Sequence, residues 1–211
     1  MEIDEKYFET NNMKKNKVED ILSDDEKVLL ELKPNRKVFI LESFFKGLPI
    51  ALIWGAFDGL VIYMMIHEKI YEYVGPFIIG IILFFFIHLI PVWLYVGGII
   101  KRLASYKNLN YYLTNKRIII RSGLIGIDYK FFYYPDINST DVKVGIFDRM
   151  FKVGDLRLIS TTQSAMLEDI ENPYVLSTKI QKIINDIKTD ISYPNDLRPK
   201  ENHGYNTDYK G

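Results

Sequence analysis

The chain has 211 residues, with 27 basic and 27 acidic residues and no cysteine. The charge balance excludes a globally basic nucleic-acid binder and an acidic disordered chain. The absence of thiols excludes disulfide scaffolds, Cys-ligated zinc, iron–sulfur clusters and thiol catalysis. Charge is unevenly distributed, because residues 41–100 hold 2 Lys/Arg and 4 Asp/Glu whereas residues 101–190 hold 14 and 10.

The first part of the chain, residues 1–42, is expected to be a cytoplasmic N-terminal segment. Its acidic start, MEIDEKYFET, predicts no cleavable signal peptide, so the first apolar stretch would direct insertion. Residues 26–41 alternate enough for a short extended segment, which Pro34 interrupts. Residues 1–25 are expected to be either mobile or a short helix that rests on another part of the chain through three apolar residues, Val18, Ile21 and Leu22.

Two long apolar stretches follow. Gly47–Ile66 has 20 residues with Asp58 as its only charge, and at about 1.5 Å per residue a helix of this length crosses about 30 Å of hydrocarbon. Tyr73–Ile100 carries no Lys, Arg, Asp or Glu over 28 positions. The alternative, a pair of buried core helices, needs a soluble shell larger than the rest of the chain supplies. We therefore expect a transmembrane hairpin over residues 43–102.

The charges beside this hairpin predict its orientation. Basic residues cluster at its two outer ends, and the short connecting loop offers only Lys69. Because cytoplasmic loops carry an excess of Lys and Arg, the expected location is the cell membrane, as a multi-pass protein with both termini cytoplasmic. The lipid bilayer is then the first expected partner. The flanking basic residues are Lys33, Arg36, Lys37, Lys46, Lys101, Arg102 and Lys107.

Two polar residues lie inside the hairpin at similar depth. Asp58 comes 12 residues after Lys46, and His88 comes 13 residues before Lys101. An ionised Asp near mid-membrane costs roughly 2.5–3.5 kcal/mol and usually finds a partner, for which His88 is the candidate. A ridge of small residues on the side of Asp58 would let the two helices approach closely or let two hairpins dimerise. This ridge consists of Ala51, Gly55 and Gly59.

Two interpretations of this pair remain open. A polar clasp between the two helices is favoured, because a transport path needs more spans and more polar positions than one hairpin offers. The alternative is a proton or ion pathway through an oligomeric membrane transporter in which the chain is one subunit and uses Asp58 and His88.

Residues 106–190 have a different sequence pattern, in which β-branched and aromatic residues alternate with charged ones between turn signals. The region after Val144 allows one short helical turn at most. Strands at this spacing predict an antiparallel barrel or sandwich of about seven strands. The expected strands are Asn110–Leu113, Lys116–Ser122, Ile127–Tyr134, Ile137–Val144, Leu156–Ser160 and Ala165–Ile170.

A C-terminal helix closes this domain. Asn172 suits its N-cap and Pro173 its first position. Apolar residues at spacings of three and four form a stripe that would plug one end of the barrel. Residues 191–211 are polar and contain Pro and Gly, which predicts a disordered tail. The stripe consists of Leu176, Ile180, Ile183, Ile184 and Ile187.

Strands followed by one capping helix are the pleckstrin-homology (PH) architecture, and three motifs sharpen this likeness. They are YYLTNKRIIIRSG (Tyr111–Gly123), YPDINSTDVKVG (Tyr134–Gly145) and FKVGDLRL (Phe151–Leu158). Together they resemble the bacterial PH-like membrane proteins of the YdbS type, and EKVLLELKPNR, with Glu26 and Pro34, resembles the segment before that family's first span. The family's Y-x-L-T-x-x-R signature is matched by Tyr111 or Tyr112, Leu113, Thr114 and Arg117.

The resemblance implies a fold with a two-helix membrane hairpin and an α+β PH-like domain, acting as a cytoplasmic binding or scaffold module. The expected partners are other membrane proteins or further copies of the chain, as a homo-oligomer, together with anionic lipids. The net charge of plus four over residues 101–190 favours an anionic membrane surface. The candidate ligand-binding residues are Lys116, Arg117 and Arg121, because guanidinium groups hold phosphate in forked hydrogen bonds.

Two features argue against other functions. Phosphoinositide-binding PH domains usually have a longer basic loop between their first two strands, whereas this chain turns at Thr114 and Asn115. No HExxH, GxSxG, Walker loop or paired metal-ligand spacing occurs among the residues, and the three histidines are scattered. We therefore expect no enzyme activity, no cofactor, no metal site and no nucleic-acid partner.

Overall fold

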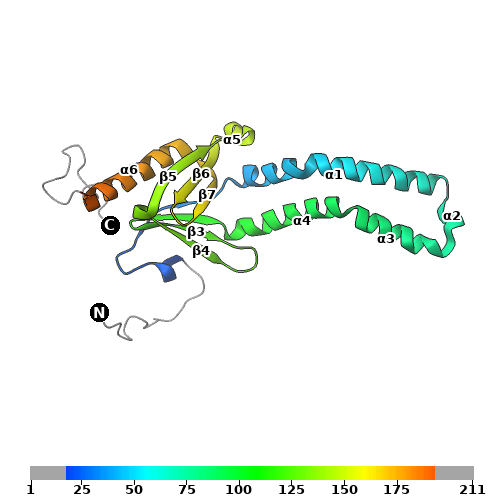
Figure 1. The fold of residues 1–211 in the computed structure, drawn as a ribbon, viewed down its shortest axis with the longest axis horizontal. Coiled ribbons are helices and arrows are strands. Elements are labelled where there is room, and N and C mark those ends of the chain that lie inside the picture. The colour runs from blue at the N-terminus through cyan, green and yellow to red at the C-terminus, as the bar shows by residue number, and fades with distance from the viewer. Residues whose placement is uncertain (1–17, 193–211) are drawn as a thin grey trace, which may run out of the picture.

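The computed structural model describes residues 18–192. It consists of a β-rich domain and a long helical hairpin that projects from one side of it (Figure 1). The strands of the described residues form two antiparallel sheets, one with the order β1-β2-β3-β4 and one with the order β5-β6-β7. Their bounds are β1 (Val28–Leu32), β2 (Asn110–Thr114), β3 (Arg117–Ser122), β4 (Asp128–Tyr133), β5 (Ile137–Lys143), β6 (Val153–Ser160) and β7 (Ser164–Glu171).

The helices divide between the hairpin and the domain. In the hairpin, α1 (Arg36–His67) leads to a tip formed by α2 (Tyr71–Val74) and the 3-10 turn η3 (Gly75–Phe77), and α3 (Ile78–His88) and α4 (Ile90–Ser105) return. The domain contains α5 (Ile146–Phe151), α6 (Pro173–Ser192) and the 3-10 turns η2 (Val18–Ile21), η4 (Tyr106–Asn108) and η5 (Tyr134–Asp136).

The core of the domain lies where the two sheets and α6 meet. Fully buried side chains from both sheets, among them Tyr111, Phe132 and Leu156, pack with the apolar stripe of α6. In that stripe Ile180 is fully buried and Ile187 packs at the margin. The antiparallel strands and the C-terminal helix are therefore confirmed. The helix runs to Ser192, two residues past its expected end, and the remainder of the expected tail lies outside the described residues.

Strand β1 comes from the segment before the hairpin. It pairs antiparallel with β2, with Leu32 opposite Tyr111 and Glu31 opposite Tyr112. The sequence analysis set residues 1–42 apart from the domain, whereas in the structure this segment supplies an edge strand of the first sheet. The hairpin is consequently an insertion between two strands that are neighbours in space, so that both of its ends lie at the same edge of the domain.

The outer face of the first sheet is covered by the turn η2. Val18 packs against Tyr112 and Ile119, and the nearby Ile21 and Leu22 join this second apolar cluster. The three apolar residues expected to rest on another part of the chain therefore rest on β2 and β3. The face of β3 that carries Ile119 is therefore covered by this turn, and Ile119 is fully buried.

The hairpin is apolar and lies almost entirely outside the core. Arg36–His67 and Tyr71–His88 are both long and apolar enough to cross a membrane, and only 6% and 0% of their most apolar windows are buried within the protein. A core helix of a soluble protein would be mostly buried. Helix α1 has 32 residues, which corresponds to a length of about 48 Å.

The second arm of the hairpin is interrupted. The sequence predicts one apolar stretch from Tyr73 to Ile100, but α3 ends at His88 and α4 begins at Ile90. Pro91 accounts for the break, because proline has no N–H to donate and its ring would clash with the carbonyl four residues earlier. Figure 1 shows the two helices following one another along α1 with a bend between them.

Candidate functional site

The base of the hairpin is tied to the domain by polar contacts. Asn35 caps α1, since its side-chain oxygen accepts from the N–H groups of Lys37 and Val38, and its own N–H donates to the Asp169 carbonyl in β7 at 2.9 Å. From α4, the Arg102 guanidinium lies 3.4 Å from the centre of the buried Phe39 ring and 2.6 Å from Glu168. These contacts join α1, α4 and β7 into one unit.

A pocket of about 420 Å³ opens between α1 and α4 at this base, and we call it the hairpin-base pocket. Its lining combines three cationic side chains, Lys46, Lys101 and Arg102, with the aromatic ring of Tyr95. A Cβ atom on Gly47 would lie 2.6 Å from Tyr95 Cδ2, so glycine is what lets this ring lie against α1. Its walls therefore offer positive charge beside apolar surface.

The cations of the hairpin-base pocket are not equally available. Arg102 is occupied by Glu168 and Phe39, as described above. Lys46 and Lys101 are both exposed, and among the described residues neither forms an ion pair. These two lysines are therefore free to contact an anion that enters the pocket.

Immediately beside this pocket, on the domain side, five acidic residues gather at what we call the acidic junction. A β-bulge in β7 creates it, since Gly154 pairs with Ile170 and Leu156 pairs with Leu167, which leaves two residues of β7 opposite Asp155 alone. Bulges re-aim side chains in this way. The second bulge residue, Asp169, has φ +51 and is 1% exposed. The acidic junction consists of Glu42, Asp148, Asp155, Glu168 and Asp169.

The N–H groups at the bulge bond to side chains instead of to backbone carbonyls of the neighbouring strand β6. Glu168 N–H donates to the buried Tyr111 hydroxyl at 2.9 Å, and Asp169 N–H donates to Asp155 Oδ1 at 3.0 Å. Asp148 in α5 accepts from Gly145 N–H through Oδ2 at 2.7 Å. The bulge and the start of α5 are thus both positioned by acidic side chains.

Three of these carboxylates converge. The carboxylate groups of Glu42, Asp148 and Asp169 each place an oxygen within 4.8 Å of the others. Burial, together with the charges of the neighbouring carboxylates of Glu42, Asp155, Asp148 and Glu168, raises the pKa of Asp169 to about 8. The sequence analysis expected no metal site because it found no paired metal-ligand spacing. These three residues come from α1, α5 and β7, and residues so far apart in the sequence leave no such spacing.

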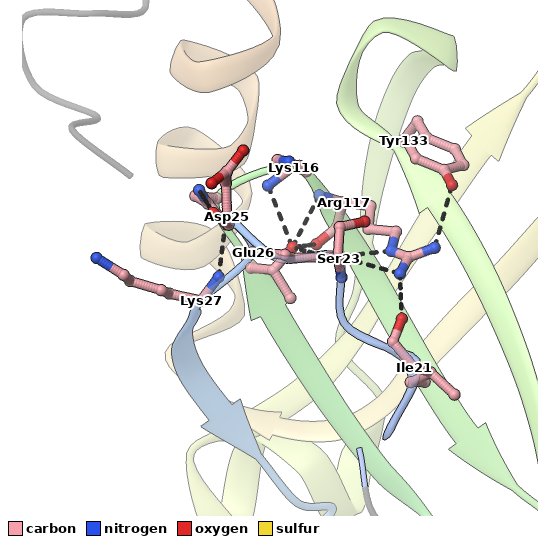
Figure 2. A network of polar contacts seen from close by, with 10 residues as sticks. Ile21, Ser23, Asp25, Glu26, Lys27, Lys116, Arg117 and Tyr133 are labelled. Carbon is pink, nitrogen blue, oxygen red and sulfur yellow. Dashed lines mark hydrogen bonds and ion pairs between the residues drawn. The ribbon is translucent and has the colours of Figure 1, made fainter. Parts of the chain in front are cut away.

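Figure 2 shows the surroundings of Arg117, which the sequence analysis proposed as a ligand for lipid or partner groups. Its guanidinium contacts both carboxylate oxygens of Glu26 at 2.9 Å, donates to the Ile21 carbonyl at 2.7 Å and reaches the Tyr133 hydroxyl at 3.1 Å. The Thr114 hydroxyl also lies 2.7 Å from Glu26. Arg117 is 7% exposed, so its donors are already used within the chain and it is not an open anion ligand.

The network around Arg117 fastens β1 to the domain. Glu26 precedes β1, whereas Thr114 and Arg117 flank the β2–β3 turn 88 or more residues later. At the same turn the Asn115 side chain accepts from Lys27 N–H at 2.9 Å and donates to the Asp25 carbonyl at 3.0 Å. The residues shared with the PH-like signature therefore close the sheet across the inserted hairpin.

The other two proposed ligand residues do not converge with Arg117. Lys116 is exposed in the β2–β3 turn. Arg121 lies four residues after Arg117 in β3, which is about 13 Å at strand spacing. Arg117 lies between these two residues in the sequence and is bonded to Glu26 and Ile21 of the N-terminal segment. The three residues therefore do not form one basic site.

Inside the hairpin, the structure brings Asp58 and His88 together. His88 Nδ1 lies 2.8 Å from Asp58 Oδ1 and 3.0 Å from Asp58 Oδ2, and Asp58 is 1% exposed. The His88 ring stacks on Phe84 with ring centres 5.4 Å apart and also lies near Trp54. A contact between a buried carboxylate of α1 and a half-buried imidazole of α3, flanked by aromatic rings, has the geometry of a clasp between the two helices.

The ridge of small residues is used within the hairpin. Ala51 is buried, and a Cβ on Gly55 would lie 3.9 Å from Val92 Cγ2 of α4. A Cβ on Gly59 would meet nothing within 4 Å. The first two positions therefore face the second arm of the same chain, and Gly59 remains open.

Comparison with known proteins places this architecture in a family. A solved structure from Shewanella loihica PV-4, described as a DUF1696 family protein with a pleckstrin-homology domain, matches with 19% identity and a TM-score of 0.27, over 35% of this chain and 68% of its own. No curated protein matches the chain. A family model described as "Bacterial PH domain" matches residues 48–190, from within α1 to the end region of α6. The chain thus belongs to the bacterial PH domain family.

Proposed function

We propose that this chain is a membrane-anchored PH-like binding module, held at the cytoplasmic surface of the cell membrane by a hairpin that crosses the bilayer twice. One observation carries the proposal: two long apolar helices leave and re-enter one sheet through the neighbouring strands β1 and β2, and their apolar side chains are largely exposed. Exposed apolar surface on this scale needs lipid or protein to cover it. The match to the bacterial PH domain family supports a binding or scaffold role.

The topology of the hairpin supports its orientation. Because β1 and β2 are hydrogen-bonded neighbours, both ends of the hairpin must lie on the same side of the membrane as the domain. Basic residues surround this base, whereas the tip between α1 and α3 carries Lys69 beside Glu68 and Glu72. The excess of positive charge at the base favours the cytoplasmic side.

The absence of native cysteine allows a direct test of this orientation. We expect a cysteine at Glu72, in the tip, to react with a membrane-impermeant maleimide added to intact cells. A cysteine at Thr162, in the exposed β6–β7 turn, is expected to react only after the cells are opened. Labelling of Thr162→Cys in sealed cells, or recovery of the full chain in the soluble fraction without detergent, would contradict the proposed anchor.

The hairpin-base pocket supports a ligand for this module. Lys46 and Lys101 are unpaired, lie beside Tyr95 and sit at the end of the apolar hairpin where a lipid headgroup would be. We infer that they bind the phosphate of an anionic phospholipid, in place of the β3 residues that the sequence analysis favoured.

A lipid-binding measurement distinguishes these two locations. We expect native mass spectrometry of the detergent-purified full chain to show preferential binding of phosphatidylglycerol over phosphatidylcholine. At about 1 kcal/mol per basic residue, Lys46→Gln/Lys101→Gln is expected to weaken this binding roughly 30-fold. The matched control, Lys116→Gln/Arg121→Gln, removes the same charge from β3 and its turn and is expected to leave it unchanged. A loss confined to the control would move the lipid site to β3.

Protein partners and self-association are also part of the proposal. Gly59 is the position of the small-residue ridge that the chain's own second arm leaves uncovered, and it supports contact with another hairpin. Crosslinking in native membranes followed by mass spectrometry would identify such contacts. The alternative function, an ion pathway in an oligomer, would require ion flux in proteoliposomes that is lost in Asp58→Asn.

A further inference from the structure

Three buried carboxylate oxygens at the acidic junction have no hydrogen-bond donor within the described residues. They are both side-chain oxygens of Asp169 and Oδ1 of Asp148, and each of these residues is 1% exposed. Buried carboxylates are normally satisfied by donors, by cations or by protonation, because an unpaired buried charge is very unfavourable. These oxygens therefore need a cation or a proton, since the described residues offer them no donor.

No positive side chain nearby forms an ion pair with the carboxylates of Glu42, Asp148 and Asp169 among the described residues. Arg102 contacts Glu168 and the Phe39 carbonyl. Lys46 lines a pocket together with Glu42, Asp155 and Glu168, and Lys143 acts on Glu42 and Asp155 only through its longer-range charge. One carboxylate oxygen of Asp155 accepts a hydrogen bond from the N–H of Asp169. The negative charge of Glu42, Asp148 and Asp169 is thus left without a direct counterion among the described residues.

We propose that Glu42, Asp148 and Asp169 bind one hard divalent cation, of the class of Mg²⁺, Mn²⁺ and Ca²⁺. Carboxylate oxygens are the preferred ligands of these ions, which bind them at about 2.0–2.6 Å. Oxygens held around one such ion lie no more than about 5 Å apart, and the three ligand atoms here lie within 4.8 Å of one another. Water completes the coordination, as is usual for Mg²⁺.

The placement of the ligands assigns the ion a role. Glu42 belongs to α1, Asp148 to α5 and Asp169 to the bulge of β7, so one cation would join the inserted hairpin to two elements of the domain. Phe45 of α1 also stacks on Phe147 of α5 with ring centres 5.1 Å apart, which brings the same elements together. The inference concerns the connection of α1 to α5 and β7, and it does not depend on lipid binding in the hairpin-base pocket.

Protons are the competing explanation. The raised pKa of Asp169 means that this carboxyl can stay protonated near neutral pH and share hydrogen bonds with its neighbours. Shared protons would satisfy the same oxygens without any metal, so the test must detect the ion directly.

The test is a titration of the chelator-stripped, detergent-purified full chain with Mn²⁺, followed by electron paramagnetic resonance at pH 8.5. We expect one bound Mn²⁺ per chain, displaced by Mg²⁺ or Ca²⁺. Asp148→Asn/Asp169→Asn is expected to weaken binding by at least about tenfold, the lower end of what loss of supporting groups does at metal sites. Asp128→Asn/Asp141→Asn, which removes two exposed carboxylates of the same domain, is expected to bind as the wild type does.

A second measurement needs no variant. The thermal unfolding midpoint of the wild-type chain is expected to rise with Mg²⁺ and to fall when a chelator is added, because an ion bound only by the folded state stabilises it. No Mn²⁺ site in the wild type, equal loss in the two double variants, or a midpoint indifferent to Mg²⁺ and chelator would each overturn the proposal in favour of shared protons.

Discussion

Truncation of Arg117 to alanine is expected to destabilise the attachment of β1 to the domain by about 3–5 kcal/mol, the usual cost of leaving one partner of a buried ion pair alone. The carboxylate left behind, Glu26, is 5% exposed and would keep only the hydroxyl of Thr114 and the N–H of Ser23. The Ile21 carbonyl and the Tyr133 hydroxyl would also lose their contacts with the guanidinium group.

Hydrogen exchange of the amides of Val28–Leu32 measures this effect. Since each 1.4 kcal/mol is tenfold, exchange from the opened state should accelerate about 140- to 3,700-fold in Arg117→Ala. The control Arg149→Ala changes an exposed arginine of α5 and should stay within about 0.5 kcal/mol of the wild type. Glu26→Met/Arg117→Met should recover most of the loss, because an apolar pair of similar volume often replaces a buried ion pair without cost.

The same ion pair has a pH dependence of known sign. Burial alone would raise the pKa of Glu26, but hydrogen bonds from Arg117, Thr114 and the Ser23 N–H outweigh burial and lower it below 4.5. A carboxyl whose folded-state pKa is lowered contributes stability above its unfolded pKa and loses it as the pH falls through the folded value. The contribution of Glu26 is therefore complete at neutral pH, where the exchange experiment is performed.

Local patterns predicted most of the domain, because strands and capped helices leave short-range signals. The alternation within Lys116–Ser122 and the Asn172-Pro173 start of the last helix both correspond to elements of the structure. The membership of β1 in the first sheet left no such signal, since its partner strand β2 follows only after the whole inserted hairpin. Pairing across that distance depends on Glu26 meeting Thr114 and Arg117, which only the folded chain shows.

The candidate sites likewise divide into those that local sequence predicts and those that only the folded chain shows. The approach of Asp58 to His88 was predictable because helical rise is constant, so equal distances from the basic ends give equal depth. Arg117 was chosen for its residue type, which cannot distinguish an open ligand from a buried partner of Glu26. The acidic junction was invisible because it depends on a bulge at Asp169 and on the packing of α1 against α5.

If the hairpin crosses the bilayer as proposed, replacement of His88 by leucine is expected to weaken it by about 2.5–3.5 kcal/mol, the cost of an unpaired Asp near mid-membrane. Asp58 is 1% exposed and has its contact with His88 Nδ1 at 2.8 Å, so the variant leaves the carboxylate facing leucine. Titration of the purified chain with SDS in mixed micelles, followed by the helical circular dichroism signal, should show the variant unfolding at a lower SDS fraction.

Three further variants separate the clasp from a general effect of substitution. Asp58→Leu/His88→Leu should be closer to the wild type than His88→Leu is, because it removes the charge together with its partner. His67→Leu, at the exposed tip of the hairpin, should change little. If Asp58→Leu folds and assembles in membranes as the wild type does while ion flux through proteoliposomes disappears, the pair serves transport rather than packing. If instead His88→Leu unfolds at a lower SDS fraction, the double variant recovers stability and no flux is found, the contact between α1 and α3 is what holds the two arms of the hairpin together.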